Sequence, residues 1–391
     1  MKITYIGDVM PLRDDQMRLV DIEHLKELKG LFAKADFAVA NLESPITHNI
    51  DREGYVVKPG RFISPIKVAH QLKQAGITHV SVSNNHSLDQ GFHGLMETLD
   101  CVREAGLVSV GASKRLGDPT YAILEKDGIK VALFASTYGT NAQINRNRLS
   151  WTQRYYLNMT QEHELLNPLA RWAYYRYKRL YYHLARIGCD TDVTTRKAYE
   201  IRQLSWFMLR DIAKKIRQMK EREQPDVFVA YPHEGGQHRA EPMLKTRRLF
   251  RWLFKQGADA IVCNHEHTIQ RAEMDRGRMA AYCLGNVVSH LGLYDTVDHN
   301  REYLSIILHQ YLGRNAAGTV EMRYTFSVAK TFFGKDGVPT TRLLNELIEE
   351  AATPEERALL IDDLHFSGTR FTGAPWTTDS PTAEEHPLPA C

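Results

Sequence analysis

The sequence has few cysteines, and their placement argues against a disulfide-stabilised fold. Its 391 residues include only five: Cys101, Cys189, Cys263, Cys283 and Cys391. Their number is odd, they are widely scattered, and none forms the Cys-x-x-Cys spacing that is typical of redox and zinc motifs. We therefore expect free thiols in a reducing compartment.

The sequence also lacks a long apolar run and an excess of charge of one sign. No window approaches the roughly 18 continuous apolar residues of a membrane span. The apolar stretch at the N-terminus is too short for a signal peptide, so we expect a cytoplasmic protein. The 50 Lys and Arg residues nearly balance the 47 Asp and Glu residues, which gives a formal net charge of +3. This balance predicts no specific nucleic-acid partner.

The sequence does contain a regular alternation of strand and helix patterns. The predicted strands cover residues 3–7, 36–43, 77–83, 121–125, 129–136, 226–232 and 258–264. The predicted helices cover residues 21–35, 65–76, 91–106 and 241–257. Repeated strand–helix–strand units of this kind predict a layered α/β sandwich.

Breaks in the alternation divide the chain into four parts. Residues 1–138 and 225–335 are predicted to form the main domain, whose later, shorter strands suit a second, antiparallel sheet. Residues 139–224 are rich in Arg and Tyr and are too long for an ordinary connection, so they predict an inserted helical lobe. Residues 336–366 predict C-terminal helices. Residues 367–391 are rich in Pro, Thr, Gly and Ser, which predicts a disordered tail.

Polar side chains follow several of the predicted strands at the point where each strand ends. They are Asp8, Asn41, Glu43, Asn84, Asn85, His86, His233, His265 and His267. The carboxyl ends of strands in an open α/β sheet share one edge, where ligands bind. Mixed oxygen and nitrogen ligands suit Mn²⁺, Fe²⁺ or Zn²⁺ better than Ca²⁺. The sequence therefore predicts a site for one or two divalent metal ions at this edge.

Several of these residues lie in longer motifs that resemble the CapA family, bacterial proteins associated with capsule and poly-γ-glutamate synthesis. The motifs, in the order of that family, are GDVM (7–10), NLESPIT (41–47), KPGRFISP (58–65), SVSNNHSLDQG (81–91), YPHEGG (231–236), QGADAIVCNHEHTIQ (256–270) and AYCLGNVV (281–288). NLESPIT and NNHSLDQG are the most specific. The CapA family is in turn similar to the calcineurin-like metallophosphoesterases. This resemblance implies a four-layer α/β/β/α sandwich, here with an inserted helical lobe.

The resemblance also implies a set of metal ligands. Asp8 would bind one ion, Asn85 would bind a second, and Glu43 would sit where a bridging carboxylate is expected. Three imidazoles would complete the set: His233, His265 and His267. A carboxylate that bridges two ions would hold them about 3.5–4 Å apart, the spacing of two-metal hydrolytic sites.

For catalysis, the resemblance implies that His86 is the general acid that protonates the leaving oxygen. Asn85 and Asp8 would complete the catalytic group. Asn84 is interpreted as the capping residue of an Asx turn that leads into the following helix. The groups placed near a bound anionic substrate are Lys58, Arg239 and Asn41, although for the two basic residues ordinary solvated surface charge is an equal alternative.

Several positions depart from the metallophosphoesterase pattern, among them Glu266 between the two histidines and the His-Glu-Gly-Gly segment 233–236. Met10 stands where the superfamily has a histidine ligand, Glu43 replaces a shorter Asp, and Asn264 replaces the usual glycine before the His-x-His motif. The missing imidazole would remove a ligand from one ion. A single tightly bound ion is therefore the alternative to two.

The segment 171–186 has two interpretations. Its tyrosines and its basic residues form separate helical stripes. The segment could act as a lid toward an anionic polymer, or as a patch for nucleic acid or a membrane surface. We favour a helix that packs its tyrosines on the core and exposes its arginines to solvent.

Two functions are consistent with these patterns. The first is a CapA-like, metal-dependent hydrolase that cleaves a phosphoester or a related bond in an anionic small-molecule or polymer substrate. The second is a non-catalytic accessory protein that binds an anionic polymer during capsule or polymer assembly. The ordered ligand set favours the enzyme, whereas the missing histidine and the basic segment favour the binding protein.

Overall fold

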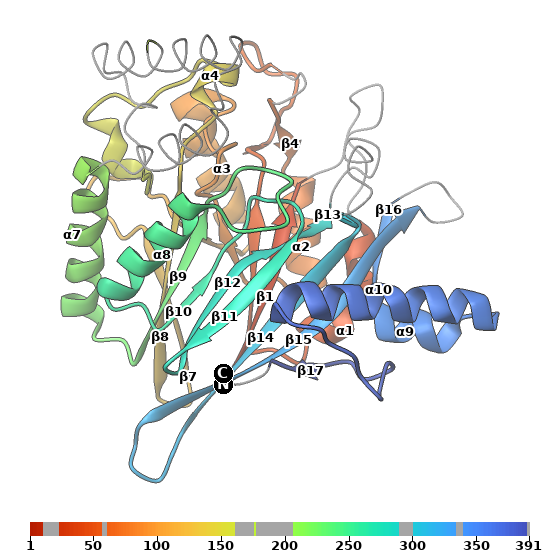
Figure 1. Ribbon diagram of the computed structural model, residues 1–391. Helices are drawn as coiled ribbons and strands as arrows, with labels where there is room; N and C mark the ends of the chain where they lie inside the picture. The colour runs from red at the N-terminus through yellow and green to blue at the C-terminus, as the bar shows by residue number, and fades with distance from the viewer. Residues whose placement is uncertain are drawn as a thin grey trace.

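The computed structural model describes residues 1–10, 23–56, 61–160, 176, 206–288, 300–333 and 339–388. Within these residues, two β-sheets pack on each other through a shared apolar core, and helices cover their outer faces (Figure 1). The α/β class that the strand–helix alternation predicts is confirmed.

The first sheet has nine strands among the described residues. Its central strands run parallel, in the spatial order β1 (Lys2–Val9), β2 (Phe37–Leu42), β5 (His79–Ser81) and β6 (Val108–Val110). On the other side of β1 lie three antiparallel strands, β14 (Leu304–Arg314), β15 (Val320–Phe333) and β16 (Pro339–Leu343). The short strands β13 (Asn286–Val288) and β17 (His386–Pro387) pair with β1 and β15, respectively.

The second sheet has six strands among the described residues. Four are parallel, in the order β12 (Arg278–Leu284), β10 (Ala260–Val262), β9 (Val227–His233) and β8 (Ile129–Thr137). Antiparallel strands lie at both edges, β11 (Ile269–Asp275) beside β12 and β7 (Tyr121–Lys126) beside β8. A separate pair, β3 (Ile46–Thr47) and β4 (Ser64–Pro65), follows β2 in the chain.

Three groups of buried apolar side chains hold these layers together. Tyr5 and Val39 of the first sheet meet Val229 and Val262 of the second in the core between the sheets. The outer face of the first sheet packs on η1 (Glu23–Leu28), α1 (Lys29–Phe32), α2 (Lys67–Ala75) and α3 (Gly91–Glu104). The outer face of the second packs on α7 (Trp206–Glu223) and α8 (Leu244–Lys255). Burying one such Ile, Leu or Phe side chain completely contributes on the order of 1.5–3 kcal/mol to the free energy of folding.

Two C-terminal helices add to the core between the sheets. They are α9 (Leu344–Glu350) and α10 (Pro354–Thr372), which contribute Leu344, Ile348, Leu364 and Phe371. Contacts of α10 with β11 in one sheet and β14 in the other place this helix against strands of both sheets (Figure 1). The hydroxyl of Thr353 caps α10 by accepting a hydrogen bond from the Glu356 N–H at 3.1 Å.

The later strands do not form the separate antiparallel sheet that the sequence predicts. They divide between the two sheets: β11 and β12 extend the second, and β14 and β15 extend the first. The reason is that β12 pairs in parallel with β10, whereas β14 pairs with β1 from the other end of the chain. Apolar alternation in a strand does not reveal its partner, so the sequence pattern could not distinguish these arrangements.

The inserted lobe at 139–224 stays a prediction, and both of its described ends pack on the main domain. At the first end, α4 (Ala142–Asn145) and η2 (Gln153–Tyr156) lead to Leu157 and Met159, which are buried against the first sheet's outer face. At the other end, α7 packs Ile212 and Ile216 on the second sheet. The Arg- and Tyr-rich segment 171–186 lies outside the described residues apart from Arg176, so its two interpretations stay predictions.

Two predictions about the C-terminal region are also wrong. Residues 340–343 belong to strand β16 and not to a helix, because they pair with β15. The tail is not disordered over residues 367–388: α10 continues to Thr372, and β17 pairs with β15. The composition of the tail predicted disorder because an average over many residues does not reveal single residues that anchor a segment. Trp376 packs on Phe326 and His386, and the Glu385 carboxylate accepts hydrogen bonds from Lys2, Tyr311 and Thr325.

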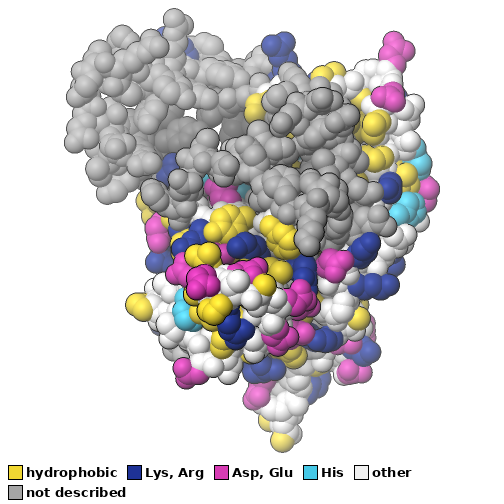
Figure 2. Space-filling view, turned by 90° about the vertical axis from the view of Figure 1, so that its right-hand side faces the viewer, with side chains coloured by type: hydrophobic (Ala, Val, Ile, Leu, Met, Phe, Trp, Pro, Cys, Tyr) yellow, Lys and Arg dark blue, Asp and Glu magenta, His cyan; other side chains and the backbone are white. Residues whose placement is uncertain are grey.

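No described helix combines the length and the apolar character that are needed to cross a membrane. On the face that α9 and α10 form, basic and acidic side chains are interspersed (Figure 2). Arg301 pairs there with Asp362 and Asp363, and Arg342 pairs with Glu350. This mixture agrees with the near-neutral charge of the whole sequence. The cytoplasmic location stays a prediction.

Candidate metal centre

The polar side chains predicted to share one sheet edge lie together and are buried. They come from the ends of β1, β2, β5, β9 and β10: Asp8, Glu43, Asn85, His86, His233, His265 and His267, each at most 4% exposed. The parallel pairing of β1 with β2, and of β9 with β10, brings these strand ends to one side of the molecule. The structure therefore brings together residues that are up to 259 positions apart in the chain (267 − 8).

The position of Asp8 depends on a close approach of two glycines. A Cβ atom on Gly7 would lie 1.8 Å from the carbonyl oxygen of Gly285, so only glycine fits at this point of β1. The Asp8 N–H donates a hydrogen bond to the same carbonyl at 3.0 Å. The GD of the first motif and the LGN of the last therefore pack on each other and fix the carboxylate at the strand end.

One group of possible metal ligands consists of Asp8, Glu43 and His267, whose ligand atoms all lie within 4.8 Å of one another. His267 Nδ1 lies 3.4 Å from Asp8 Oδ2, and its Nε2 lies 3.9 Å from Glu43 Oε1. Asn286 Oδ1 lies 2.9 Å from His267 Nδ1. If that nitrogen carries the proton, the Nε2 lone pair is left for a cation.

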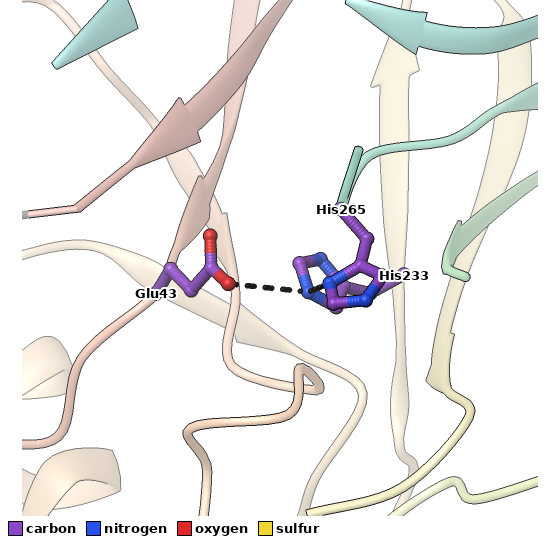
Figure 3. A group of neighbouring side chains, drawn as sticks. All are labelled: Glu43, His233 and His265. Atoms are coloured by element: carbon purple, nitrogen blue, oxygen red, sulfur yellow. Dashed lines mark hydrogen bonds and ion pairs between the residues drawn. The ribbon is translucent and has the colours of Figure 1, made fainter. Parts of the chain in front are cut away.

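A second group consists of Glu43, His233 and His265, again with ligand atoms within 4.8 Å (Figure 3). Three atoms surround the Nε2 of His233: Asn85 Oδ1 at 2.7 Å, His265 Nδ1 at 3.0 Å and Glu43 Oε1 at 3.3 Å. A ring nitrogen forms one good hydrogen bond at most. Two of these three atoms therefore need a partner other than His233, and a cation between them would provide it.

Glu43 belongs to both groups, and its carboxylate is the best test of whether they fit a metal. The side chain is fully buried, yet neither carboxylate oxygen accepts a hydrogen bond from any described residue. The Asn85 Nδ2 donor also lacks a hydrogen-bond partner in the described part of the chain. Leaving a buried polar atom without a partner costs about 1–3 kcal/mol. The donor set therefore fits one or two divalent cations, with Glu43 between them.

Burial dominates the electrostatics of the possible ligands. It raises the pKa of Asp8 to about 7, with a further contribution from the charge of Glu43, and it also raises the pKa of Glu43. Burial lowers the pKa of His233 to about 4 and lowers the pKa of His265 and His267. The imidazoles are therefore neutral, as metal ligands must be. A bound cation would favour the charged form of both carboxylates.

His86 differs from the other imidazoles because it has a carboxylate partner. Its Nδ1 lies 2.7 Å from Asp89 Oδ2, and its ring packs on Phe62 with 4.6 Å between the ring centroids. Burial alone would lower the pKa of His86, but the charge and hydrogen bond of Asp89 and the nearby Glu43 raise it. The opposite ring nitrogen, Nε2, lies 3.9 Å from Glu43 Oε1 and is directed into the site. A protonated imidazole at this position can donate a proton to a substrate.

Asp89 and Asn84 hold the loop that carries His86. Asp89 also accepts hydrogen bonds from the Phe62 N–H at 2.6 Å and from Asn145 Nδ2 at 3.2 Å. Asn84 Oδ1 accepts the His86 N–H at 3.1 Å, which is the predicted Asx turn. Asn84 Nδ2 donates to the carbonyl of Leu42 at 2.7 Å and ties this loop to the end of β2.

The backbone of the His-x-His loop is strained. His265 has φ = 119° and His267 has φ = 58°. Residues other than glycine rarely adopt a positive φ. Such conformations cost on the order of 1–3 kcal/mol each and are common in ligand clamps. The His265 N–H donates to Asp8 Oδ2 at 3.2 Å, and Glu266 accepts the N–H groups of Gly236 and Arg239 at 2.7 and 3.1 Å. These bonds keep both imidazoles directed into the site.

The three residues predicted to contact substrate do not form one cluster in the described residues, unlike the predicted metal ligands. Asn41 is 1% exposed, donates to Asp8 Oδ1 at 2.7 Å and accepts from Asn84 at 3.2 Å. Both ends of its amide are engaged in positioning the site, and its contact with a substrate stays a prediction. Arg239 lies half-buried on the loop that Glu266 caps, and its contact with an anion stays a prediction. Lys58 lies outside the described residues.

Several contributors were not identified from the sequence. Asn286, in the AYCLGNVV motif, orients His267, and its position directly after a strand was an available signal. Tyr138 packs on His265 with 4.7 Å between the ring centroids. The buried Lys245 ammonium lies 2.8 Å from Glu234 and 5.0 Å from the Tyr138 ring centroid. Neither of these contacts has a sequence signal, because they join β8, β9 and α8 only in the folded chain.

Comparisons with known proteins agree with the motifs. A family model described as bacterial capsule synthesis protein PGA_cap matches residues 2–291. PGA biosynthesis protein CapA of Bacillus subtilis (strain 168) is 22% identical over 338 residues, which cover 82% of this chain and 70% of that protein. Capsule biosynthesis protein CapA of Bacillus anthracis is 22% identical over 314 residues, which cover 76% of this chain and 62% of that protein.

Two further matches carry no functional description. Uncharacterized protein y4sH of Sinorhizobium fredii (strain NBRC 101917 / NGR234) is 26% identical over 310 residues, which cover 72% of this chain and 64% of that protein. The crystal structure of a hypothetical protein from Thermus thermophilus covers 88% of this chain and 98% of its own, with 15% identity and a TM-score of 0.39. The chain thus spans between 62% and 70% of the length of these curated relatives.

Proposed function

Because the chain belongs to the family of bacterial capsule synthesis proteins PGA_cap, we propose that it is a metal-dependent hydrolase of the metallophosphoesterase type. The bond cleaved is a phosphoester or a related bond in an anionic substrate, in the biosynthesis of a capsule or of poly-γ-glutamate. The two packed sheets with helices on both outer faces support the four-layer arrangement of that superfamily as part of the proposal.

The observation that carries the proposal is the position of Glu43. Its two buried oxygens lack hydrogen-bond donors among the described residues, and it belongs to both ligand groups. A purely structural carboxylate at this position would have acquired donors, as the buried Glu266 has from two backbone N–H groups. We assign one ion to Asp8, Glu43 and His267, and a second to Glu43, Asn85, His233 and His265.

The chain's own residues have three tasks in this reaction. Divalent ions, when bound, would polarise the phosphoryl group and lower the pKa of an attacking water. Asn41 and the His265 N–H hold the Asp8 carboxylate in place. Asp89 keeps a proton on His86, whose Nε2 delivers it to the leaving oxygen as the ester bond breaks. Burial of the whole set excludes bulk water and strengthens these interactions.

The test combines metal content with activity. Purified protein reconstituted with Mn²⁺ should contain at least one equivalent of metal and should hydrolyse an aryl phosphodiester. Asp8→Ala should lose the activity and the equivalent of metal that we assign to Asp8, Glu43 and His267. An activity that survives in Asp8→Ala would come from a contaminant, and metal content well below one equivalent in the intact protein would refute the assignment.

The alternative is a non-catalytic protein that binds an anionic polymer, and Met10 is the observation that favours it. This buried thioether occupies the position where the resemblance expects an imidazole ligand, which leaves the Asp8 group with one ligand fewer. In that case the protein should retain poly-γ-glutamate in a sedimentation assay while it hydrolyses no phosphodiester. Binding that is unchanged in His86→Asn, together with no turnover in the intact protein, would favour this function.

A further inference from the structure

A second group of metal-ligating side chains lies outside the centre described above. His48 directly follows β3, and Glu97 and Cys101 lie one turn apart on α3. One ligand atom from each of these three residues lies within 4.8 Å of the other two. The group combines an imidazole, a carboxylate and a thiol, and it shares no residue with the Glu43 centre.

The distances within this group match a tetrahedral metal site. His48 Nδ1 lies 3.4 Å from Cys101 Sγ and 3.9 Å from Glu97 Oε1. Metal–ligand bonds of about 2.0–2.3 Å at tetrahedral angles separate neighbouring ligand atoms by about 3.3–3.6 Å. Small side-chain rotations would therefore be enough for all three atoms to contact one ion.

The neighbours of the group orient the ligand atoms toward each other. His48 Nε2 lies 2.8 Å from Glu104 Oε2, so the proton of the neutral ring belongs on Nε2 and the Nδ1 lone pair faces Cys101. Glu97 Oε1 accepts hydrogen bonds from Thr47 Oγ1 at 2.5 Å and from the His48 N–H at 3.2 Å. Carboxylates behind a ligating imidazole, and hydrogen bonds to a ligating carboxylate, are the usual supports of a metal site.

Exposure places the group at the surface. The His48 side chain is 49% exposed and that of Glu97 is 12% exposed, whereas Cys101 is buried. An ion held here would have three protein ligands and a fourth position open to solvent. A thiolate with an imidazole selects zinc-like ions over Mg²⁺ and Ca²⁺, which prefer oxygen ligands.

We propose that His48, Glu97 and Cys101 form a second metal site, for Zn²⁺ or an ion of similar softness. Binding releases the Cys101 thiol proton to solvent and leaves the thiolate on the metal. The ion links His48, five residues after Glu43, to the helix that follows the His86 loop. It therefore braces two of the segments that carry the main centre.

Cobalt tests this proposal because a thiolate ligand gives Co²⁺ a charge-transfer absorption band in the near ultraviolet. Titration of the 391-residue protein with Co²⁺ should produce this band with a stoichiometry of one. His48→Asn, at a half-exposed position where folding is not at risk, should abolish it, as should Cys101→Ser. His70→Asn, which changes a histidine on α2, is the matched control and should retain it. Glu104→Gln should weaken Co²⁺ binding about 10-fold.

The band also separates this site from the Glu43 centre, whose proposed ligands include no sulfur. Glu43→Gln should therefore keep the band even if it removes every other bound ion. A wild-type protein that shows no band at a large excess of Co²⁺ would mean that His48 and Cys101 form only a thiol–imidazole hydrogen bond. A band that persists in both His48→Asn and Cys101→Ser would belong to another cysteine and would equally overturn the proposal.

Discussion

Replacing Glu43 by Gln should raise the stability of the metal-free protein and remove its stabilisation by metal. The Glu43 side chain is fully buried, and burial raises its pKa, so the charged form is disfavoured in the folded state. Its charge also contributes to the raised pKa of Asp8. Gln has nearly the same size but no charge. The substitution therefore removes the charge of a buried carboxylate that accepts no hydrogen bond from any described residue, without creating a cavity.

The size of the effect follows from two terms. Removing a buried charge that has no hydrogen-bond donor should gain about 1–3 kcal/mol for Glu43→Gln in the absence of metal. With an unfolding entropy of roughly 2.1 cal/mol/K per residue, this gain raises the Tm of a chain of 391 residues by about 1–4 °C. Wild-type protein at a metal concentration 100 times its Kd should gain about 2.7 kcal/mol, or roughly 3 °C. The variant should gain almost nothing from the metal.

The assay is thermal unfolding of both proteins with EDTA and with added Mn²⁺. Glu266→Gln provides a matched control of opposite sign, because that carboxylate accepts two backbone N–H groups and its replacement should lower the Tm under both conditions. If Glu43→Gln lowers the Tm in EDTA as Glu266→Gln does, then Glu43 has structural donors and the reasoning fails. A Mn²⁺-dependent gain that survives in Glu43→Gln would remove this residue from the metal site.

Three further predictions concern catalysis, acid stability and the C-terminal tail. His86→Asn should retain bound metal, measured by elemental analysis, and lower phosphodiester turnover by ~10²-fold or more; equal loss of metal would make His86 a ligand instead. Burial alone would raise the pKa of Glu385, but His309, Lys2 and Thr325 lower it to about 2 from 4.5. The contribution of Glu385 to the free energy of unfolding is therefore present above about pH 4.5 and is lost as the pH falls toward 2. The difference in Tm between wild type and Glu385→Gln should close over that range. A difference that stays constant would contradict this prediction. Trp376→Ala should lower the free energy of unfolding by about 1–3 kcal/mol, because this half-buried ring packs on Phe326 and His386; denaturant unfolding with no change in midpoint would mean that the tail contributes nothing.

The residues of the candidate centre could be predicted because each follows directly on a recognisable strand. Asp8, His233 and His265 come after β-branched runs, and parallel strands bring their carboxyl ends to one edge. Their convergence is thus a consequence of chain direction alone. What direction does not determine is which polar group belongs to the ligand set. Asn41 and Glu43 are two residues apart at the end of β2, yet one positions Asp8 and the other enters both ligand groups.

Boundaries and partners could not be predicted, because they depend on contacts between distant segments. Helix α7 lies within the predicted insertion, and its Ile212, Ile216 and Met219 form an apolar stripe that packs on the second sheet. That spacing was visible in the sequence, whereas the sheet that it packs on was not. The tail shows the same limit, since one carboxylate, Glu385, and one indole, Trp376, fix a segment whose composition predicts disorder.

The ligand positions of the centre are held by lateral bonds between strand ends, and this explains how the strain of the site is tolerated. Asn41, at the end of β2, donates to Asp8 on β1 and accepts from Asn84, which follows β5. The same Asp8 carboxylate accepts the N–H of His265, whose φ of 119° costs on the order of 1–3 kcal/mol. A hydrogen bond to a charged group returns roughly 1.5–3 kcal/mol, which is enough to offset that cost. The protein chain can therefore preorganise its imidazoles and carboxylates for a cation, so that binding energy need not be used to assemble them.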